Sequence, residues 1–518
     1  MVARNVVLMI GTGPLLYLPD YVQPVKDRLP RVQLIPGHDS DKGFFLLSAW
    51  RYYFNESFKG RYHLDYYSEK GIGTGVTHSY DTERLGDGVL DLYYVGDRDK
   101  VSFEEKVHVG GDRYKAQLRH RWTNGEGTFA TMQLNKFSDP YFLKDYFYRQ
   151  YEQNTSPLSY LSVNHTFANS ALSVLAQKRL NDFYERVEYL PRLTYDTFRS
   201  RIGDTGLYFD SRHEFSNLAR RFPDPSNNDR EALRFDTRNT LSYQQKLAWL
   251  SLRPFAGTRQ TYYSRDAAGD DDITRGVFFT GIEASTRLYR MFDSNIDLWG
   301  VHIDALKHIV TPIVSYQYTH KPTVSSDRLL QFDEIDSISR SDTATFTLEN
   351  KLQAKNSEKV WDLLYFAPAV NYAFNEEGRG SHLTDATWRL EFRPTDILSL
   401  QQTGTFDLDR LERVTETATD IVWNTRPFRL SLGHRYVRNE DDTFVSSLNW
   451  KVAPGWEFIN YLRYDQELNE FERQEYVLRK ELNCWFVDLG FGLENDDEKT
   501  VWLIFTLKAF PEAAVSLH

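Results

Sequence analysis

Four cationic side chains fall on alternating positions of one short segment, and their spacing is the strongest chemical signal in this sequence. They are Arg113, Lys115, Arg119 and Arg121. Residues two apart in a β-strand share one face, so these groups would form a single positive row. Guanidinium and ammonium groups bind phosphate through charge-assisted hydrogen bonds. The row is therefore either a set of phosphate contacts or a solvated polar wall, and the sequence leaves both interpretations open.

The other reactive residue types do not form a catalytic set. The single cysteine, Cys484, permits no intrachain disulfide, so it is either a small strand residue or a redox group whose partner lies on a further segment. Asp333 and Asp336 are spaced like paired carboxylates, but without a nearby His or metal-ligand pattern a loop turn is favoured. The 13 His are scattered, and the metalloprotease, nucleophile-elbow and P-loop motifs are absent. We expect no enzyme, no cofactor and no metal site.

The composition indicates which elements must carry the positive row. Aromatic residues make up 15% of the chain and charged residues 26%, with a mean hydropathy of −0.55. No run of about 18 apolar residues occurs, which excludes a transmembrane helix. A transmembrane β-barrel accommodates both aromatic and charged residues, because its outer face is apolar and its interior is polar. The net charge of −11 argues against nucleic acid as a partner.

Strict alternation of side-chain type predicts strands. Between Arg113 and Trp122, apolar residues and His120 take one face, and the cations with Gln117 take the other. Roughly 20 residues for each strand with its connection gives on the order of 24 to 26 strands. We predict an all-β fold, a large transmembrane antiparallel β-barrel whose last strand is Val501–Phe510. Asp139–Asn154 breaks the alternation and predicts a short helix within a loop. A soluble β-sandwich or propeller is the alternative fold.

Over nearly its whole length the chain resembles the LPS-assembly proteins of the outer membrane, the LptD (OstA, Imp) family. Its opening, Gly11–Arg28, is similar to that family's link between a periplasmic jelly roll and a barrel. Further similar segments are Leu34–Gly37, Gly43–Phe45, Tyr52–Asn55, Phe137–Tyr146, Tyr189–Leu193, Leu252–Tyr263, Lys307–Tyr318 and Gln331–Asp336, with the ending from Asn483. We expect a remnant of the jelly-roll domain and linker at residues 1–27 and an outer-membrane β-barrel at residues 28–518. The N-terminus is too short for a secretory signal, so we expect an N-terminally truncated sequence.

The resemblance implies a function and partners. It implies a protein of the cell outer membrane that inserts lipopolysaccharide (LPS) into the outer leaflet, through a polar lumen and a lateral gate between the first and last strands. It further implies the lipoprotein LptE as a plug, docking of the periplasmic bridge protein LptA on the missing part of the N-terminal jelly-roll domain, and contact with outer-membrane lipids. The positive row would then meet phosphates of lipid A or of the core sugars. The alternative function is a passive or substrate-specific porin, which needs a constriction loop and no plug.

Three residues are candidates for the lateral gate: Pro36, Gly37 and Gly43. Proline donates no backbone hydrogen bond, and each ladder bond contributes about 0.5–1.5 kcal/mol net, so Pro36 would weaken the seam while the glycines add flexibility. Alternatively, Pro36 simply starts a strand after a turn. The chain departs from the family at two places. It has 49–51 (Ala-Trp-Arg) where the family often has a second proline, and Cys484 alone where well-studied members have a cysteine pair.

Overall fold

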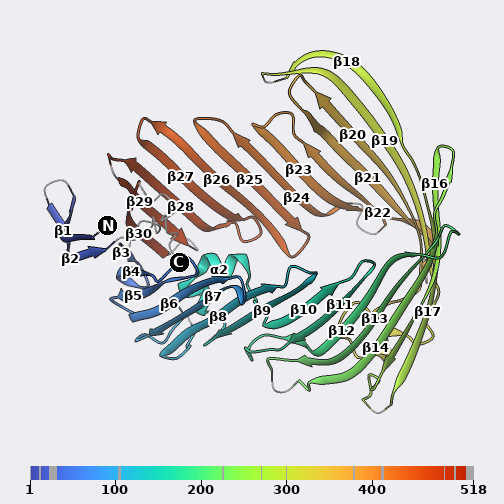
Figure 1. Ribbon diagram of the computed structural model, residues 1–518, viewed down its shortest axis with the longest axis horizontal. Helices are drawn as coiled ribbons and strands as arrows, with labels where there is room; N and C mark the ends of the chain where they lie inside the picture. The colour runs from blue at the N-terminus through green and yellow to red at the C-terminus, as the bar shows by residue number, and fades with distance from the viewer. Residues whose placement is uncertain are drawn as a thin grey trace.

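In the computed structural model most of the chain rolls into one closed antiparallel β-barrel (Figure 1). The structure describes residues 2–10, 13–22, 32–102, 107–224, 227–269, 271–298, 300–376, 380–409, 413–483, 485–494 and 498–508. Within these ranges strands β3 to β30 form the wall. Because β15 continues β14 and β18 continues β17, the barrel has 26 strands. The predicted all-β barrel and its size are confirmed.

The strands of the barrel follow one another in chain order. The first half comprises β3 (Val32–Asp39), β4 (Gly43–Tyr53), β5 (Phe58–Tyr67), β6 (Gly71–Thr82), β7 (Gly86–Gly96), β8 (Asp112–Thr123), β9 (Thr128–Phe137), β10 (Tyr160–Thr166), β11 (Ser170–Gln177), β12 (Arg186–Arg201), β13 (Leu207–Arg221), β14 (Arg230–Tyr243), β15 (Gln245–Leu247) and β16 (Leu250–Tyr263). The second half comprises β17 (Ile273–Thr286), β18 (Leu288–Leu298), β19 (Val301–Thr319), β20 (Ser341–Lys355), β21 (Val360–Glu376), β22 (Gly380–Phe392), β23 (Leu398–Asp407), β24 (Arg413–Asn424), β25 (Phe428–Val437), β26 (Asp441–Ala453), β27 (Trp456–Asp465), β28 (Glu470–Glu481), β29 (Trp485–Glu494) and β30 (Glu498–Leu507).

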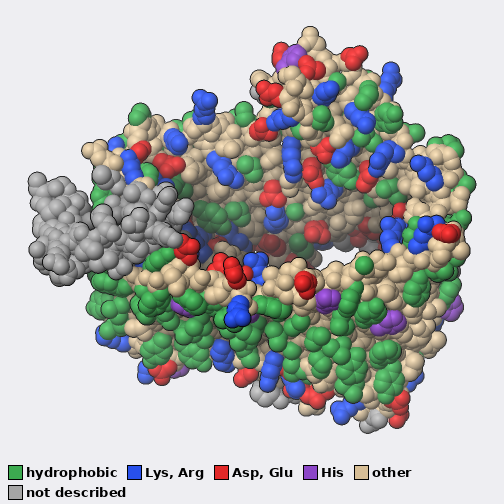
Figure 2. Space-filling model, viewed as in Figure 1, with side chains coloured by type: hydrophobic (Ala, Val, Ile, Leu, Met, Phe, Trp, Pro, Cys, Tyr) green, Lys and Arg blue, Asp and Glu red, His purple; other side chains and the backbone are tan. Residues whose placement is uncertain are grey.

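Side chains alternate between the two faces of the wall. In β5, Leu64 and Tyr66 are 55% and 43% exposed, whereas His63 and Asp65, which alternate with them, are buried. Figure 2 shows hydrophobic side chains gathered over the outer surface of the near wall, with charged side chains along its rims. This arrangement suits a wall with lipid outside and water inside. Among the described residues no helix is both long enough and apolar enough to cross a bilayer.

The connections at the two ends of the barrel differ in length. The end at which β3 starts carries short turns, such as 54–57, 83–85, 124–127 and 167–169. The other end carries the longest connections, 97–111, 138–159 and 320–340. Outer-membrane barrels have short periplasmic turns and longer extracellular loops. The difference in length therefore gives the barrel two distinct ends, with Val32 at the short-turn end.

Two of the long connections fold against the barrel wall from within. The helical segment, residues 138–159, contains α1 (Phe142–Tyr146) and α2 (Tyr148–Gln153), which confirms the short helix predicted at Asp139–Asn154. The 320–340 segment contains the 3₁₀ turn η1 (Ser326–Arg328). Both segments place apolar residues in buried clusters, including Phe142 and Phe147 of the first and Leu330 and Phe332 of the second.

The observed strands near the two ends of the chain agree only in part with the predicted domain boundary and last strand. β1 (Val2–Ile10) and β2 (Gly13–Val22) form a separate two-stranded sheet. Their assignment to a jelly roll, and the domain boundary after residue 27, stay predictions. The last strand begins at Glu498 and ends at Leu507, slightly earlier than the predicted Val501–Phe510, whose final residues 509–510 lie outside the described ranges.

Candidate functional site: the seam and the helical segment

The barrel closes through an unusually short ladder between its first and last strands. β3 and β30 pair at Gly37↔Trp502, His38↔Val501 and Asp39↔Thr500. By contrast, β3 pairs with β4 along its whole length, and β30 pairs with β29 likewise. No ladder pair joins the described residues 32–36 to 503–507. The pairing therefore stops at Pro36, the residue that has no N–H to donate. Pro36 lies within β3, so it does not begin a strand after a turn.

Side chains fasten the paired end of the seam. The Thr500 hydroxyl donates to Asp39 Oδ2 at 2.6 Å, and the backbone N–H groups of Asp41 and Lys42 donate to Asp39 Oδ1. Ser40 N donates to the Lys499 carbonyl at 3.1 Å. The seam is thus held at the end of the long connections and lacks ladder pairs toward the short-turn end, where Val32 lies.

The two predicted gate glycines serve different local needs. A Cβ on Gly37 would lie 2.2 Å from Phe45 Cζ and 2.6 Å from the Val501 carbonyl oxygen, so only glycine allows β30 to approach this closely. Gly43 follows the turn into β4 with φ of +70°, a conformation that favours glycine. Their predicted part in gate flexibility stays a prediction.

The positive row predicted from the sequence divides into two environments. Arg113 is fully buried and pairs with Asp145 at 2.6 Å, Asp139 at 2.9 Å and Asp97 at 3.4 Å. Asp139 and Asp145 belong to the helical segment, so Arg113 fixes that segment to the wall at β8. A buried charge needs partners of this kind, because desolvation is costly. The guanidinium of Arg113 is therefore already paired with carboxylates of the chain itself.

Lys115 is the second buried member of the row. Its Nζ contacts Asp91 at 2.8 Å and the Gln150 side-chain oxygen at 3.3 Å, and lies 3.4 Å from the centre of the Phe147 ring. It therefore binds the helical segment as well. Gln150 and Phe147 complete the contact from the segment's side, and neither has a sequence signal that pairs it with β8.

The other two cations are exposed on the same strand. Arg121 is 71% exposed and pairs with Asp87 at 3.1 Å, and Arg119 is exposed beside a cavity that Gln133 also lines. Contact of the row with phosphate stays a prediction, and Arg119 and Arg121 are its accessible members. Cys484 lies outside the described residues, so its role as a strand residue or a redox group stays a prediction.

Asp333 and Asp336 bind an arginine of the wall. Arg234 of β14 is fully buried and pairs with Asp333 at 2.7 Å and with Asp336 at 2.9 Å. Tyr263 donates to Asp336 at 2.7 Å. The carboxylates therefore anchor the 320–340 segment, in agreement with the structural interpretation of these residues. The sequence did not single out Arg234, although its position in an alternating strand signals an inward face.

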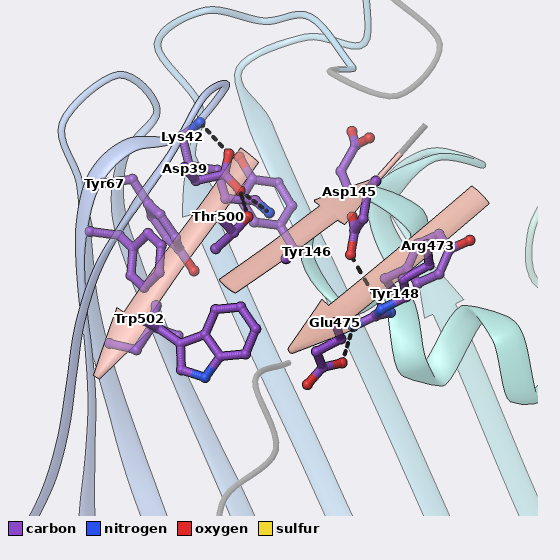
Figure 3. Close-up of a pocket in the computed structure, with 14 residues that line it drawn as sticks. Asp39, Lys42, Tyr67, Asp145, Tyr146, Tyr148, Arg473, Glu475, Thr500 and Trp502 are labelled. Carbon is purple, nitrogen blue, oxygen red and sulfur yellow. Dashed lines mark hydrogen bonds and ion pairs between the residues drawn. The ribbon is translucent and has the colours of Figure 1, made fainter. Parts of the chain in front are cut away.

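A cavity of about 70 Å³ lies where the helical segment faces the seam (Figure 3). Its lining comes from three regions: Asp39 and Tyr67 from the first strands, Tyr148 from α2, and Arg473 and Trp502 from the last strands. The cavity is thus charged and aromatic together. Within the described ranges no group of three or more His, Cys, Asp or Glu is arranged to hold a metal ion.

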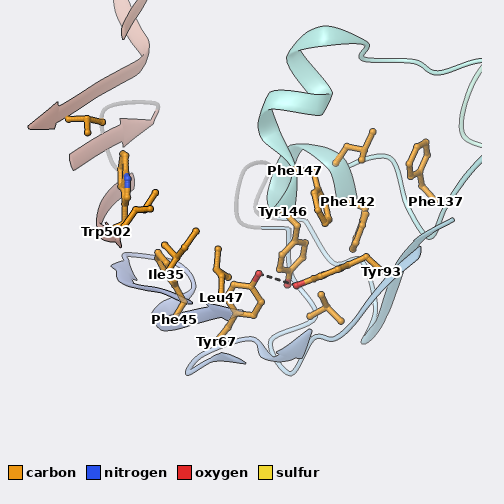
Figure 4. Close-up of a cluster of buried hydrophobic side chains, with 14 residues drawn as sticks. Ile35, Phe45, Leu47, Tyr67, Tyr93, Phe137, Phe142, Tyr146, Phe147 and Trp502 are labelled. Atoms are coloured by element: carbon orange, nitrogen blue, oxygen red, sulfur yellow. Dashed lines mark hydrogen bonds between the residues drawn. The ribbon is translucent and has the colours of Figure 1, made fainter. Parts of the chain in front are cut away.

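Beside this cavity, apolar side chains from both ends of the chain form one buried cluster (Figure 4). Ile35 and Leu47 lie on the first two strands, Tyr146 on α1, and Trp502 and Ile504 on β30. Packing here connects β3 and β30 where their backbones are not paired. Sequence reasoning missed these side chains, because no local pattern links positions so far apart in the chain.

Comparison with known sequences gives one family. The sequence model described as LptD, LPS transport system D, matches residues 111–444, which is more than half of the chain. The chain is 21% identical to the LPS-assembly protein LptD of Pseudoalteromonas atlantica, over 93% of this chain and 65% of that protein. It is 22% identical to the LptD of Psychrobacter arcticus, over 82% of this chain and 47% of that protein. The chain therefore spans less than two thirds of the length of these relatives.

Comparison with solved structures gives distant likenesses. The siderophore receptor PirA from Pseudomonas aeruginosa aligns over 92% of this chain and 79% of its own, with 7% identity and a TM-score of 0.32. The FrpB iron transporter from Neisseria meningitidis aligns over 92% and 80%, with 10% identity and a TM-score of 0.30. At these TM-scores the likenesses carry no argument about function.

Proposed function

The chain belongs to the LptD family, LPS transport system D, and from this premise we propose that it inserts lipopolysaccharide into the outer leaflet of the outer membrane. In this proposal the sugar head group passes through the polar lumen, and the acyl chains leave through a lateral gate between β3 and β30. The observation that supports a gate at this place is the three-pair ladder, which ends at Pro36.

The physical argument starts from the cargo. Acyl chains prefer the membrane and the sugar head prefers water, so a single molecule needs a wet passage that is open to lipid on one side. Parting two barrel strands is costly in lipid, because the backbone groups of both strands lose their hydrogen-bond partners and find no water to replace them. At about 0.5–1.5 kcal/mol net for each hydrogen bond, a ladder of three residue pairs costs far less to part than the ten-pair ladder between β29 and β30.

The geometry also favours a direction of opening. Short turns belong to the periplasmic end of an outer-membrane barrel, and the β3–β30 ladder is missing toward that end. The seam would therefore part first on the side from which lipopolysaccharide arrives. LptE as a plug in the wide lumen, and LptA docked on the N-terminal domain, complete the proposed path. Arg119 and Arg121 are the proposed contacts for phosphates of lipid A or the core.

A passive or substrate-specific porin is the second candidate, because two connections fold inward as constriction loops do. The family membership favours lipopolysaccharide. Conductance of the purified protein in planar bilayers separates the two: a porin gives a steady open-channel current in the absence of any partner. The proposed translocon should instead lose its current when LptE fills the lumen.

The gate is tested by joining the seam. In a Cys484→Ser background, His38→Cys and Val501→Cys place two thiols on a described ladder pair, and an oxidant or short crosslinker joins them. We expect delivery of lipopolysaccharide to the cell surface to stop on crosslinking and to resume on reduction or cleavage. The matched control joins Phe235→Cys to Tyr262→Cys, an outward-facing pair of β14 and β16, and should leave delivery intact. Unimpaired delivery through a fully crosslinked seam contradicts the gate.

A further inference from the structure

We propose that the helical segment is a strap that holds the gate closed from inside the lumen. The gate opens when the contacts between this strap and β28 break. This inference rests on the proposed gate between β3 and β30. It assigns the closing contacts to named residues of α2 and β28, none of which belongs to the seam itself.

The strap is attached firmly on the side of the first strands. Arg113 of β8 is fully buried and pairs with Asp139 and Asp145 of the segment. The hydroxyl of Tyr146 donates to Asp97 at 3.1 Å, and the Phe147 ring packs against Tyr93 with centroids 5.0 Å apart. All of these side chains are buried. This side therefore behaves as part of the wall formed by β7 and β8.

On the side of the last strands the attachment is ionic, and one of its members, Arg149, is accessible to water. Arg149 of α2 donates to both oxygens of Glu475 in β28, at 2.8 and 3.1 Å, and its side chain is 37% exposed. Arg473 of β28 lies 3.7 Å from Glu152 and 5.0 Å from the centre of the Tyr148 ring. These contacts join α2, which follows β9, to β28 on the other side of the seam. Figure 3 shows Tyr148 of α2 beside Arg473 of β28.

The difference between the two attachments decides which one breaks. The part-exposed Arg149 can exchange Glu475 for water at little cost. The buried Arg473 keeps Glu475 and Glu494 as partners on β28 and β29 when Glu152 leaves. Freeing Arg113 would instead leave buried carboxylates without their cation. β28, β29 and β30 are joined by continuous ladders, so they move together when β30 leaves β3. The strap would remain with β7 and β8. The pairs Arg149–Glu475 and Glu152–Arg473 must then separate as the gate opens.

The first experiment measures opening directly, with no lipopolysaccharide present. Ile35→Cys in the Cys484→Ser background places a thiol in the buried cluster at the unpaired part of the seam, where Ile35 is 3% exposed. In the purified full chain in detergent micelles, the rate at which a charged maleimide labels this thiol reports parting of the strands. Arg149→Glu and Glu475→Arg should each raise this rate about threefold or more, and the double variant should restore it.

A matched pair controls for loss of charge alone. Arg253 and Glu283 also form a 2.8 Å ion pair at partial exposure, but they lie on β16 and β17, away from the seam. Arg253→Glu and Glu283→Arg should leave the labelling rate unchanged. Near-ultraviolet circular dichroism of every variant verifies that the barrel is folded. Unchanged labelling in the folded Arg149→Glu and Glu475→Arg variants, or a double variant that stays fast, overturns the strap.

A second measurement separates this inference from the gate. In the Arg149→Glu variant, crosslinking His38→Cys to Val501→Cys before Ile35→Cys is labelled, with the crosslinked species isolated, should return labelling to its slow rate. Labelling that stays fast in a crosslinked seam shows that the thiol is reached while residues 37–39 remain joined to β30, which overturns the strap as the element that holds this ladder closed. The gate itself is judged by delivery of lipopolysaccharide through the crosslinked seam, so the two proposals fail on different readouts.

Discussion

At the scale of single residues, Arg113 and Arg121 show how one strand gives the same side chain two environments. Both lie on β8 at even spacing and so on the same, inward face. Arg113 is fully buried among three carboxylates, whereas Arg121 is 71% exposed. The difference comes from the helical segment, which covers the first position and ends before the second. The chemistry of each arginine is therefore set by what folds over the strand.

Replacing Arg113 should be far more damaging than replacing Arg121. Arg113→Met leaves Asp97, Asp139 and Asp145 buried without their cation, which should lower the free energy of unfolding by about 3–5 kcal/mol. Arg121→Met removes an exposed pair and should cost about 0–1 kcal/mol. Urea unfolding in detergent, followed by tryptophan fluorescence, measures both. Equal losses in the two variants would show that Arg113 is not a structural anchor.

The sequence predicted the faces of this row but not its partners. Alternation alone separates Arg113 and Lys115 from Tyr114, and the exposure of these residues agrees. The carboxylates that bind Arg113 lie in connections, where side-chain position follows no period. No spacing rule links Arg113 to Asp97 or Asp145, so phosphate contact was as reasonable for Arg113 as for Arg121.

At the scale of elements, the two connections that fold inward are each fixed to the barrel wall by a buried arginine. The 320–340 segment is anchored by Arg234, which takes Asp333, Asp336 and Glu214 as partners. Burial raises the pKa of Asp333, but the hydrogen bond and charge of Arg234, with hydrogen bonds from the Ile335 N–H and the Tyr189 hydroxyl, together lower it by more. The net pKa is therefore below its ordinary value of 3.8, which means that the folded segment favours the carboxylate.

Acid should loosen this segment before it unfolds the wall. A group whose pKa is lowered by folding stabilises the fold fully above its ordinary pKa, and this stabilisation is lost as pH falls through the lowered value. Hydrogen exchange of residues 320–340, expressed relative to the intrinsic rate at each pH, should therefore rise as the pH falls below about 4, the ordinary value being 3.8. Asp333→Asn should exchange faster already at neutral pH and show a smaller acid step. An identical acid step in this variant would assign the effect to other groups.

Strands were predictable where polar and apolar side chains alternate, and the path of the chain was unpredictable where this alternation ends. The break at Asp139–Asn154 predicted a helix within a loop, and α1 and α2 lie there. That the helices turn inward and reach β28 follows from packing between Tyr146, Phe147 and side chains of distant strands, which no local pattern contains. Pro36 was identified as a break in pairing, although its place within β3 required the fold.

At the scale of the whole molecule, composition and side-chain alternation together favoured a transmembrane barrel over a soluble β-sandwich or propeller. High aromatic content with high charge and no long apolar run leaves a transmembrane barrel as the arrangement that satisfies both lipid and water. The strand number followed from chain length. The closure of β3 on β30 could be expected from a closed sheet, but the extent of their pairing could not. It depends on one proline and on how Gly37 admits β30.

The two faces of the wall should respond oppositely to a new charge. Leu134 of β9 is 39% exposed on the outer face, and its neighbour Gln133 lines a lumen cavity. Leu134→Arg should destabilise the barrel in lipid vesicles by about 2–4 kcal/mol if the position is at the bilayer midplane, falling toward the interfaces. Gln133→Arg should be nearly neutral, because water solvates it. Urea unfolding in vesicles measures both, and a reversed order would invert the assignment of faces.

The pairing of β3 with β30 has a consequence for biogenesis. These strands are separated by almost the entire polypeptide, and closing so long a loop is entropically slow. Every other neighbouring pair of the barrel lies close in sequence and can form early, but this one must wait for β30. The joint completed last in assembly is also the one with fewest bonds to undo. A sheet that closes late through a few residue pairs retains, in its mature form, an easy way of becoming open again.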